Sequence, residues 1–148
     1  MLVQPLAFIP KIPFWHVWTD LNGISRQSQQ WMEGFVLEQL CSGTDSLWVG
    51  PRRSGKATML TLVLPSGYVG EWHENPSPQW ILPVSGCWSV ETMDGQVVEM
   101  GPGQISFGGD QNTRSDGERH GHRSRALGQQ PAVLLLVQVS PEMCPPIP

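Results

Sequence analysis

The stretch of sequence that decides the fold runs from Gly67 to Gly86 and reads GYVGEWHENPSPQWILPVSG. Five residues separate Gly67 from His73, three separate Asn75 from Gln79, and six separate Gln79 from Gly86. The glycine at each end favours a tight turn. Between these turns we expect two short strands joined by a proline-rich loop. The stretch therefore predicts a pair of strands that brings His73, Asn75 and Gln79 close together.

The rest of the chain predicts more short strands. It has 16 Gly and 14 Pro in 148 residues, and both residue types interrupt long helices. The turn Met93-Asp94-Gly95 is the strongest hairpin signal, because Asp-Gly suits a two-residue hairpin loop. A strand about every 8–12 residues is typical of a sandwich or barrel. The expected strands cover residues 14–18, 31–40, 57–64, 68–75, 80–84, 87–92, 96–100, 104–107, 122–127 and 132–139. For residues 31–40 a short helix is the alternative, but Gly34 favours the strand.

The Gly67–Gly86 spacing resembles the first motif of the cupin family, G-x5-HxH-x3-4-E-x6-G. Asn75 stands in the place of the second histidine, and Gln79 stands in the place of the glutamate. The resemblance is closest to small single-domain cupins that carry WH-x-x-P-x-x-Q, and it covers roughly residues 60–139. It implies an all-β fold, the cupin double-stranded β-helix or jelly-roll barrel.

A second cupin motif is matched less well. Gly103-x-Ile105-x-Phe107, followed by Gly121-His122, resembles it, but a long polar loop over residues 108–121 replaces the family's short turn. Ala126 stands where the family has asparagine. We expect one domain in three parts. Residues 1–56 form strands and loops that pack on the barrel or on a partner subunit, residues 57–140 form the barrel, and residues 141–148 form a loose tail.

The resemblance also implies a metal site. Metal-binding cupins hold a divalent ion with three histidines and one glutamate. Imidazoles with amide oxygens suit Zn, Ni, Fe or Mn, although the loss of the anionic glutamate should weaken binding and leave a bound ion more Lewis-acidic. Glu71 and His120 stand as alternative ligands, since alternate residues of a strand share a face. The expected metal ligands are His73, Asn75, Gln79 and His122; no catalytic residue is identified.

Each of these four residues also has an interpretation without metal. For His73 and His122 the alternative is a hydrogen-bonded histidine inside the barrel without a metal. Asn75 suits a turn residue that bonds the backbone before Pro76. Gln79 suits a hydrogen-bonding partner of a substrate or of His73. His16 is expected to be structural.

Three functions follow. The first is a metal-binding small-molecule cupin, for which the resemblance implies dioxygenase or isomerase chemistry. The second is a metal-free module that binds a carbohydrate or a carboxylate. The third is a structural or assembly role, because seven Trp in so short a chain suit a large apolar interface. The expected partners are a small molecule in the barrel and a second copy of the chain, since cupins commonly form homodimers.

Several functions are disfavoured. A formal net charge of -4 offers no general attraction to nucleic acid or acidic membranes. The stretch GPRRSGKA, residues 50–57, nearly matches a phosphate loop, but it ends in Ala and leads into a strand instead of a helix. Three widely spaced cysteines without a CxxC pair predict reduced thiols in the cytoplasm. We expect no signal peptide and no membrane span, because the longest apolar run, residues 132–137, is too short.

Overall fold

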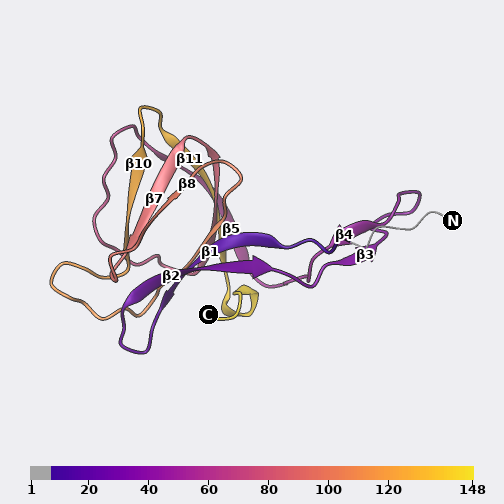
Figure 1. Ribbon diagram of the computed structural model, residues 1–148, viewed down its shortest axis with the longest axis horizontal. Helices are drawn as coiled ribbons and strands as arrows, with labels where there is room; N and C mark the ends of the chain where they lie inside the picture. The colour runs from indigo at the N-terminus through magenta and orange to yellow at the C-terminus, as the bar shows by residue number, and fades with distance from the viewer. Residues whose placement is uncertain (1–7) are drawn as a thin grey trace.

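The computed structural model describes residues 8–148, and strands make up most of its regular structure (Figure 1). A single short 3-10 helix, η1 (Pro141–Met143), follows the last strand of this part of the chain. The strands within the described residues are β1 (Ile12–Thr19), β2 (Ser25–Met32), β3 (Val36–Glu38), β4 (Leu47–Val49), β5 (Ala57–Leu64), β6 (Gln79–Ser85), β7 (Cys87–Thr92), β8 (Val97–Met100), β9 (Ser106–Gly109), β10 (His122–Leu127) and β11 (Ala132–Val139).

Two sheets form the body of the molecule. The larger has six strands in the order β2-β1-β9-β6-β11-β5, and the smaller has three in the order β10-β7-β8. Strands distant in the sequence lie side by side, as when β1 pairs in parallel with β9 and β11 lies between β5 and β6. This is the all-β architecture of two packed sheets that the sequence predicted. The N-terminal strands β1 and β2 belong to the larger sheet itself.

The main core lies between the two sheets. Alternate residues of β11 supply one side of it, with Leu134 and Leu136 facing Trp88 and Val90 of the smaller sheet. The other face of the larger sheet carries a second cluster around Phe14 and Phe107. Because strand side chains alternate between faces, the larger sheet is apolar on both sides.

Four expected strands have the bounds that the sequence predicted: residues 57–64, 87–92, 122–127 and 132–139. The strand expected over residues 68–75 is wrong. That segment forms only isolated bridges to β10, at Val69–Arg125 and His73–His122. Gly70 and the prolines that follow Asn75 account for the difference, since neither residue type favours a regular strand.

The strand expected over residues 31–40 is also placed wrongly. β2 ends at Met32, and Gly34 adopts φ 81°, which breaks the chain before β3 begins. Most of β2 escaped prediction because its buried side chains are polar. Ser25 and Gln27 point inward, where Gln27 donates to the Val90 carbonyl (2.9 Å) and Ser25 donates to the Gly121 carbonyl (2.6 Å). Hydrogen bonds there replace the apolar contacts that sequence patterns detect.

Between β2 and β5 the chain leaves the body. β3 and β4 pair only with each other, and the hairpin they form projects away from the sheets (Figure 1). We call residues 33–51 the arm. The segment with the near-match to a phosphate loop connects the arm to β5 and opens no helix. Within residues 8–148, no helix has the length and apolar character needed to cross a membrane.

Candidate functional site

A pocket of about 80 Å³ lies between the two sheets. One end of it is polar and receives all four residues that the sequence singled out, His73, Asn75, Gln79 and His122. The rest of the lining is mostly apolar. The remaining residues that line the pocket are Leu62, Leu64, Tyr68, Ile81, Trp88, Ser124, Leu134 and Leu136.

His73 is held beside His122 by the backbone. Each residue's amide N–H donates to the other's carbonyl at 2.9 Å, and their ring centroids are 4.6 Å apart. The Nδ1 atom of His73 lies 2.8 Å from the Glu71 carbonyl oxygen. A carbonyl only accepts, so Nδ1 carries the proton and Nε2 keeps a free lone pair. Burial lowers the pKa of His73, which keeps this imidazole neutral at pH 7.

His122 is held by a buried carboxylate. Its Nδ1 atom lies 2.6 Å from Oδ2 of Asp110, whose exposed fraction is 0%. A carboxylate at Nδ1 fixes the tautomer and the ring orientation of a histidine, and it raises the basicity of Nε2. Both imidazoles of the pocket therefore have Nδ1 committed to an acceptor and Nε2 free.

Hydrogen bonds hold the long loop between β9 and β10 in place, and the loop thereby positions Asp110 at its start and His122 at its end. Glu74 accepts hydrogen bonds from the Thr113 amide (2.8 Å) and the Thr113 hydroxyl (2.5 Å). The same hydroxyl oxygen accepts from the Gly121 amide at 2.7 Å. Gly121 adopts φ 61°, and a Cβ atom there would collide with the His73 carbonyl. Only glycine lets the chain pass this close to His73 before it enters β10.

The two amide side chains lie differently. Gln79 faces the pocket from the start of β6, and its Oε1 accepts from Nε2 of Gln138 at 3.3 Å. The Nδ2 atom of Asn75 lies against Gly108, buried and without a hydrogen-bond partner. This leaves Oδ1 as the end of the Asn75 amide that is available to the pocket.

The pocket offers two imidazoles and two amide side chains, which are donor types that divalent transition metal ions accept. Within residues 8–148 no cluster of three or more His, Cys, Asp and Glu side chains has the geometry of a metal site. The two free Nε2 atoms and the amide oxygens are thus the donors that the pocket offers. Of the two alternative ligands, Glu71 is exposed and supplies only its carbonyl, to His73, and His120 does not border the pocket.

Asp110 is the site residue that the sequence did not identify. It lies in a polar loop whose residues show no periodic pattern, directly after the strand that ends in Gly108-Gly109. Asp110 is buried only because hydrogen bonds hold the whole loop against the sheets. The one feature of the sequence that could have pointed to Asp110 is the preceding glycine pair, which permits close packing at the end of β9.

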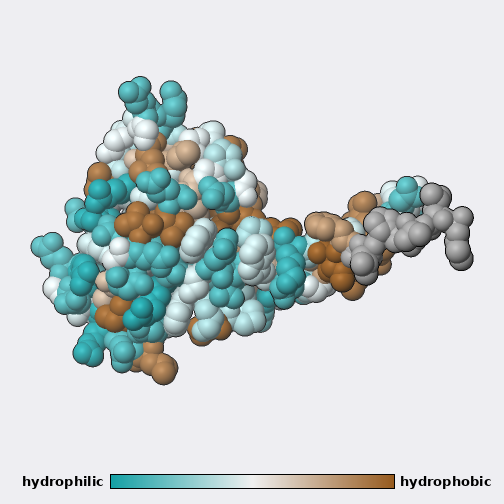
Figure 2. Space-filling view, viewed as in Figure 1, coloured by the Kyte–Doolittle hydropathy of each residue, from teal (hydrophilic) through white to brown (hydrophobic). Residues whose placement is uncertain are grey.

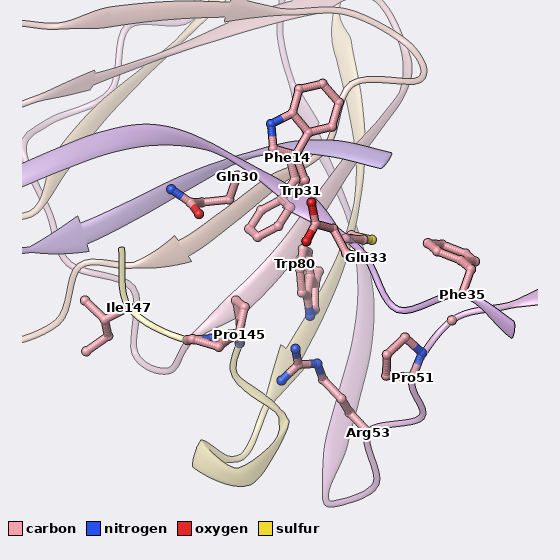
Figure 3. Close-up of a pocket in the computed structure, with 13 residues that line it drawn as sticks. Phe14, Gln30, Trp31, Glu33, Phe35, Pro51, Arg53, Trp80, Pro145 and Ile147 are labelled. Atoms are coloured by element: carbon pink, nitrogen blue, oxygen red, sulfur yellow. The ribbon is translucent and has the colours of Figure 1, made fainter. Parts of the chain in front are cut away.

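A larger pocket of about 280 Å³ lies on the outer face of the six-stranded sheet (Figure 3). Phe14, Trp31 and Trp80 form its sheet side, so Trp80 faces away from the cavity that Gln79 and Ile81 line. Arg53 lines this outer pocket and donates to the Cys144 carbonyl at 2.8 Å, so the segment after the arm is fastened to the C-terminal tail. The outer pocket contains no histidine, and the inner pocket is the better candidate for chemistry.

The arginines near His122 are paired at the surface. Arg123 donates to Glu91 at 2.7 Å and stacks on the Trp72 ring at 5.3 Å from its centroid. Arg119 pairs with Asp116 at 2.8 Å. Neither arginine borders the inner pocket, so their role in the structure is to pack and pair.

No protein-family model and no curated protein matches this chain. Among solved structures, protein NMB1881 from Neisseria meningitidis is similar with 17% identity and a TM-score of 0.40, over 61% of this chain and 82% of that one. The DMSP lyase DddQ from Ruegeria pomeroyi DSS-3 is similar with 16% identity and a TM-score of 0.44, over 78% of this chain and 52% of that one. The strand order and the Gly67–Gly86 spacing carry the fold assignment: this is an all-β protein of cupin-like fold with a polar pocket between its sheets.

Proposed function

We propose that this protein binds a small organic molecule between its two sheets, beside a divalent transition metal ion held by His73 and His122. The observation that carries the proposal is that the two imidazoles make the same kind of hydrogen bond. Each has Nδ1 engaged by an acceptor, and each leaves Nε2 free in the same pocket. Neutral imidazole nitrogens fixed in this way are the commonest ligands for Zn, Ni and Fe in proteins.

The remaining residues of the pocket have separate tasks. Asn75 and Gln79 offer amide oxygens to the ion or hydrogen bonds to the organic molecule. Asp110 positions His122 and does not reach the pocket itself. The apolar part of the lining excludes water and receives the hydrocarbon part of the ligand. The proposed reaction class is a dioxygenase or isomerase reaction, for which a bound ion would supply Lewis acidity toward a ligand oxygen.

A metal-free binding module is the second candidate, and one observation favours it. The pocket is lined by neutral polar side chains and by no carboxylate of residues 8–148. The amides of Asn75 and Gln79 and the hydroxyl of Ser124 can hydrogen-bond the oxygen atoms of a carboxylate or a carbohydrate. This candidate needs no ion, so metal analysis separates it from the first.

The test is the metal content of the full chain purified without chelator, followed by titration of the metal-free protein with Zn²⁺ and Co²⁺. We expect about one ion per chain, and visible absorption from Co²⁺ that reports nitrogen ligands. The double substitution His73→Ala with His122→Ala should abolish both signals. His120→Ala is the matched control, because His120 lies two residues before His122 in the sequence but does not line the pocket. This variant should bind the metal as the unchanged chain does.

Equal metal binding by the unchanged chain and the double variant would contradict the metal proposal. The metal-free candidate then gains support if a carboxylate or a sugar binds in the presence of chelator and Asn75→Ala weakens that binding. Absence of both kinds of binding would overturn both candidates.

A further inference from the structure

The outer pocket lies where three parts of the chain meet (Figure 3). The larger sheet forms one wall, the root of the arm forms a second, and the tail after η1 forms a third. Its volume is about 280 Å³, whereas the inner pocket has about 80 Å³. A protein cavity of about 150 Å³ holds one benzene ring. The outer pocket therefore has room for two fused rings, and the inner pocket does not.

The sheet wall of the outer pocket is aromatic. Phe14, Trp31 and Trp80 come from three different strands, β1, β2 and β6. The ring of Trp80 is fixed from two sides, because it lies edge-on to Phe14 (centroids 5.2 Å apart) and against Phe107 (4.8 Å). Trp31 is 49% exposed, so its indole is open to a partner. Aromatic rings bind other planar rings by offset stacking or by edge-to-face contact.

The arm and the tail hold the other two walls in place. Figure 2 shows hydrophobic side chains on the projecting arm, and Phe35 lines the pocket at its root. A Cβ atom on Gly50 would stand only 3.3 Å from the Phe35 ring, so the two sides of the arm pack closely at this point. On the tail, Cys144 packs against the second core cluster, and Pro145 is buried. The pocket is thus formed before a ligand enters it.

Arg53 makes this pocket attractive to an anion. Its Nη1 atom donates to the Cys144 carbonyl at 2.8 Å, which fixes the guanidinium, and it forms no ion pair with a carboxylate of residues 8–148. Glu33 is the one carboxylate among the described residues of the lining, and it lies 2.9 Å from Nζ of Lys11, which balances its charge. A guanidinium suits a carboxylate, because parallel N–H groups can donate to both carboxylate oxygens.

We propose that the outer pocket binds a small planar aromatic carboxylate, with its rings against Trp31 and Trp80 and its carboxylate on the guanidinium of Arg53. The aromatic wall receives the rings, and the anchored cation receives the acid. This site and the pocket of His73 and His122 lie on opposite faces of the larger sheet. The inference therefore does not depend on the metal proposed for the inner pocket.

The test is isothermal titration calorimetry of the full chain with 2-naphthoate, an acid with two fused rings, in the presence of a metal chelator. We expect one molecule bound per chain, with an affinity in the micromolar range. 2-Naphthamide has the same rings without the charge, so it should bind at least about 10-fold more weakly. No binding at about 1 mM 2-naphthoate, or equal affinities for the acid and the amide, would overturn the proposal.

Substitution of Arg53 locates the carboxylate. Arg53→Gln should lower the affinity for 2-naphthoate at least about 10-fold and leave the affinity for 2-naphthamide nearly unchanged, because only the acid uses the charge. Arg52→Gln is the matched control, since Arg52 is the next residue in the chain but pairs with Glu38 and does not line the pocket. It should bind 2-naphthoate as the unchanged chain does. An equal loss for both ligands in Arg53→Gln would mean that Arg53 only holds the tail, which contradicts the proposal.

Substitution of Trp31 locates the rings. Trp31→Ala should weaken the acid and the amide alike, at least about 10-fold, because both lose the same aromatic face. Trp31 is half exposed, so the variant should fold, and urea denaturation checks that it does. His73→Ala changes the inner pocket and should leave the binding of 2-naphthoate unchanged. Unweakened binding by folded Trp31→Ala would place the ligand elsewhere and overturn the proposal.

Discussion

Two buried histidines lie in this protein, and their surroundings differ in a way that separates a packed ring from a site. His122 is 4% exposed, has a carboxylate at Nδ1 and opens with its other nitrogen on a pocket. His16 is 2% exposed and packs edge-on against Phe107, and its Nδ1 has no hydrogen-bond partner. Burial is therefore shared by both histidines and does not identify function. The orienting carboxylate and the pocket make the difference.

The largest effect that we expect is the loss of stability when the carboxylate partner of His122 is removed. Asp110→Ala removes the acceptor of a fully buried pair and leaves Nδ1 of His122 without a partner, so we expect a loss of about 3–5 kcal/mol in the free energy of unfolding. Urea denaturation at pH 7 measures it. Asp116→Ala is the control. Asp116 pairs with Arg119 at the exposed surface, and its removal should cost less than about 1 kcal/mol. Equal losses in the two variants would show that Asp110 holds nothing together.

The next effect concerns His16. Burial lowers the pKa of His16 from 6.5 to about 4, so between these pH values the unfolded chain binds a proton that the folded chain refuses. Stability is therefore full above pH 6.5, falls as the pH drops toward 4 and levels off below it. A shift of this size corresponds to roughly 3 kcal/mol. Because the pKa of His73 is lowered as well, His73 contributes a fall in the same direction.

The substitution His16→Phe isolates this contribution. Phenylalanine keeps a planar ring among Phe14 and Phe107 and cannot take up a proton. The difference in unfolding free energy between pH 7 and pH 4 should shrink by roughly 3 kcal/mol relative to the unchanged chain. Urea denaturation at several pH values gives both curves. An unchanged pH dependence would mean that His16 accepts its proton without cost and is less enclosed than its packing indicates.

The sequence predicted the part of the site that one stretch of chain carries. His73, Asn75 and Gln79 meet in the pocket because turns at Gly67 and Gly86 bound the stretch, and both glycines adopt positive φ. The agreement concerns only where these three residues lie. That they bind a metal stays a prediction.

Asp110 and β2 were missed for related physical reasons. Asp110 is buried only because Glu74 and Thr113 fold a polar loop back on the barrel, and no local pattern encodes those contacts. β2 alternates as a strand should, but its inward residues are Ser25 and Gln27. Patterns of hydrophobicity find residues that bury apolar surface, and they do not find polar residues whose burial depends on distant hydrogen-bond partners.

The smallest effect that we expect is on metal affinity, and it compares the two buried histidines by function. Asp110→Asn keeps an acceptor for Nδ1 of His122 but removes the negative charge, so the Nε2 atom of this ring becomes a weaker donor. On the proposed function, the affinity for Zn²⁺ should fall about 10–100-fold, which is the usual effect of changing such an orienting partner. Competition with a chromophoric chelator measures it. His16→Phe changes the other buried histidine and should leave the affinity unchanged. If Asp110→Asn binds as tightly as the unchanged chain, Asp110 only supports the fold, and the two buried histidines differ in packing alone.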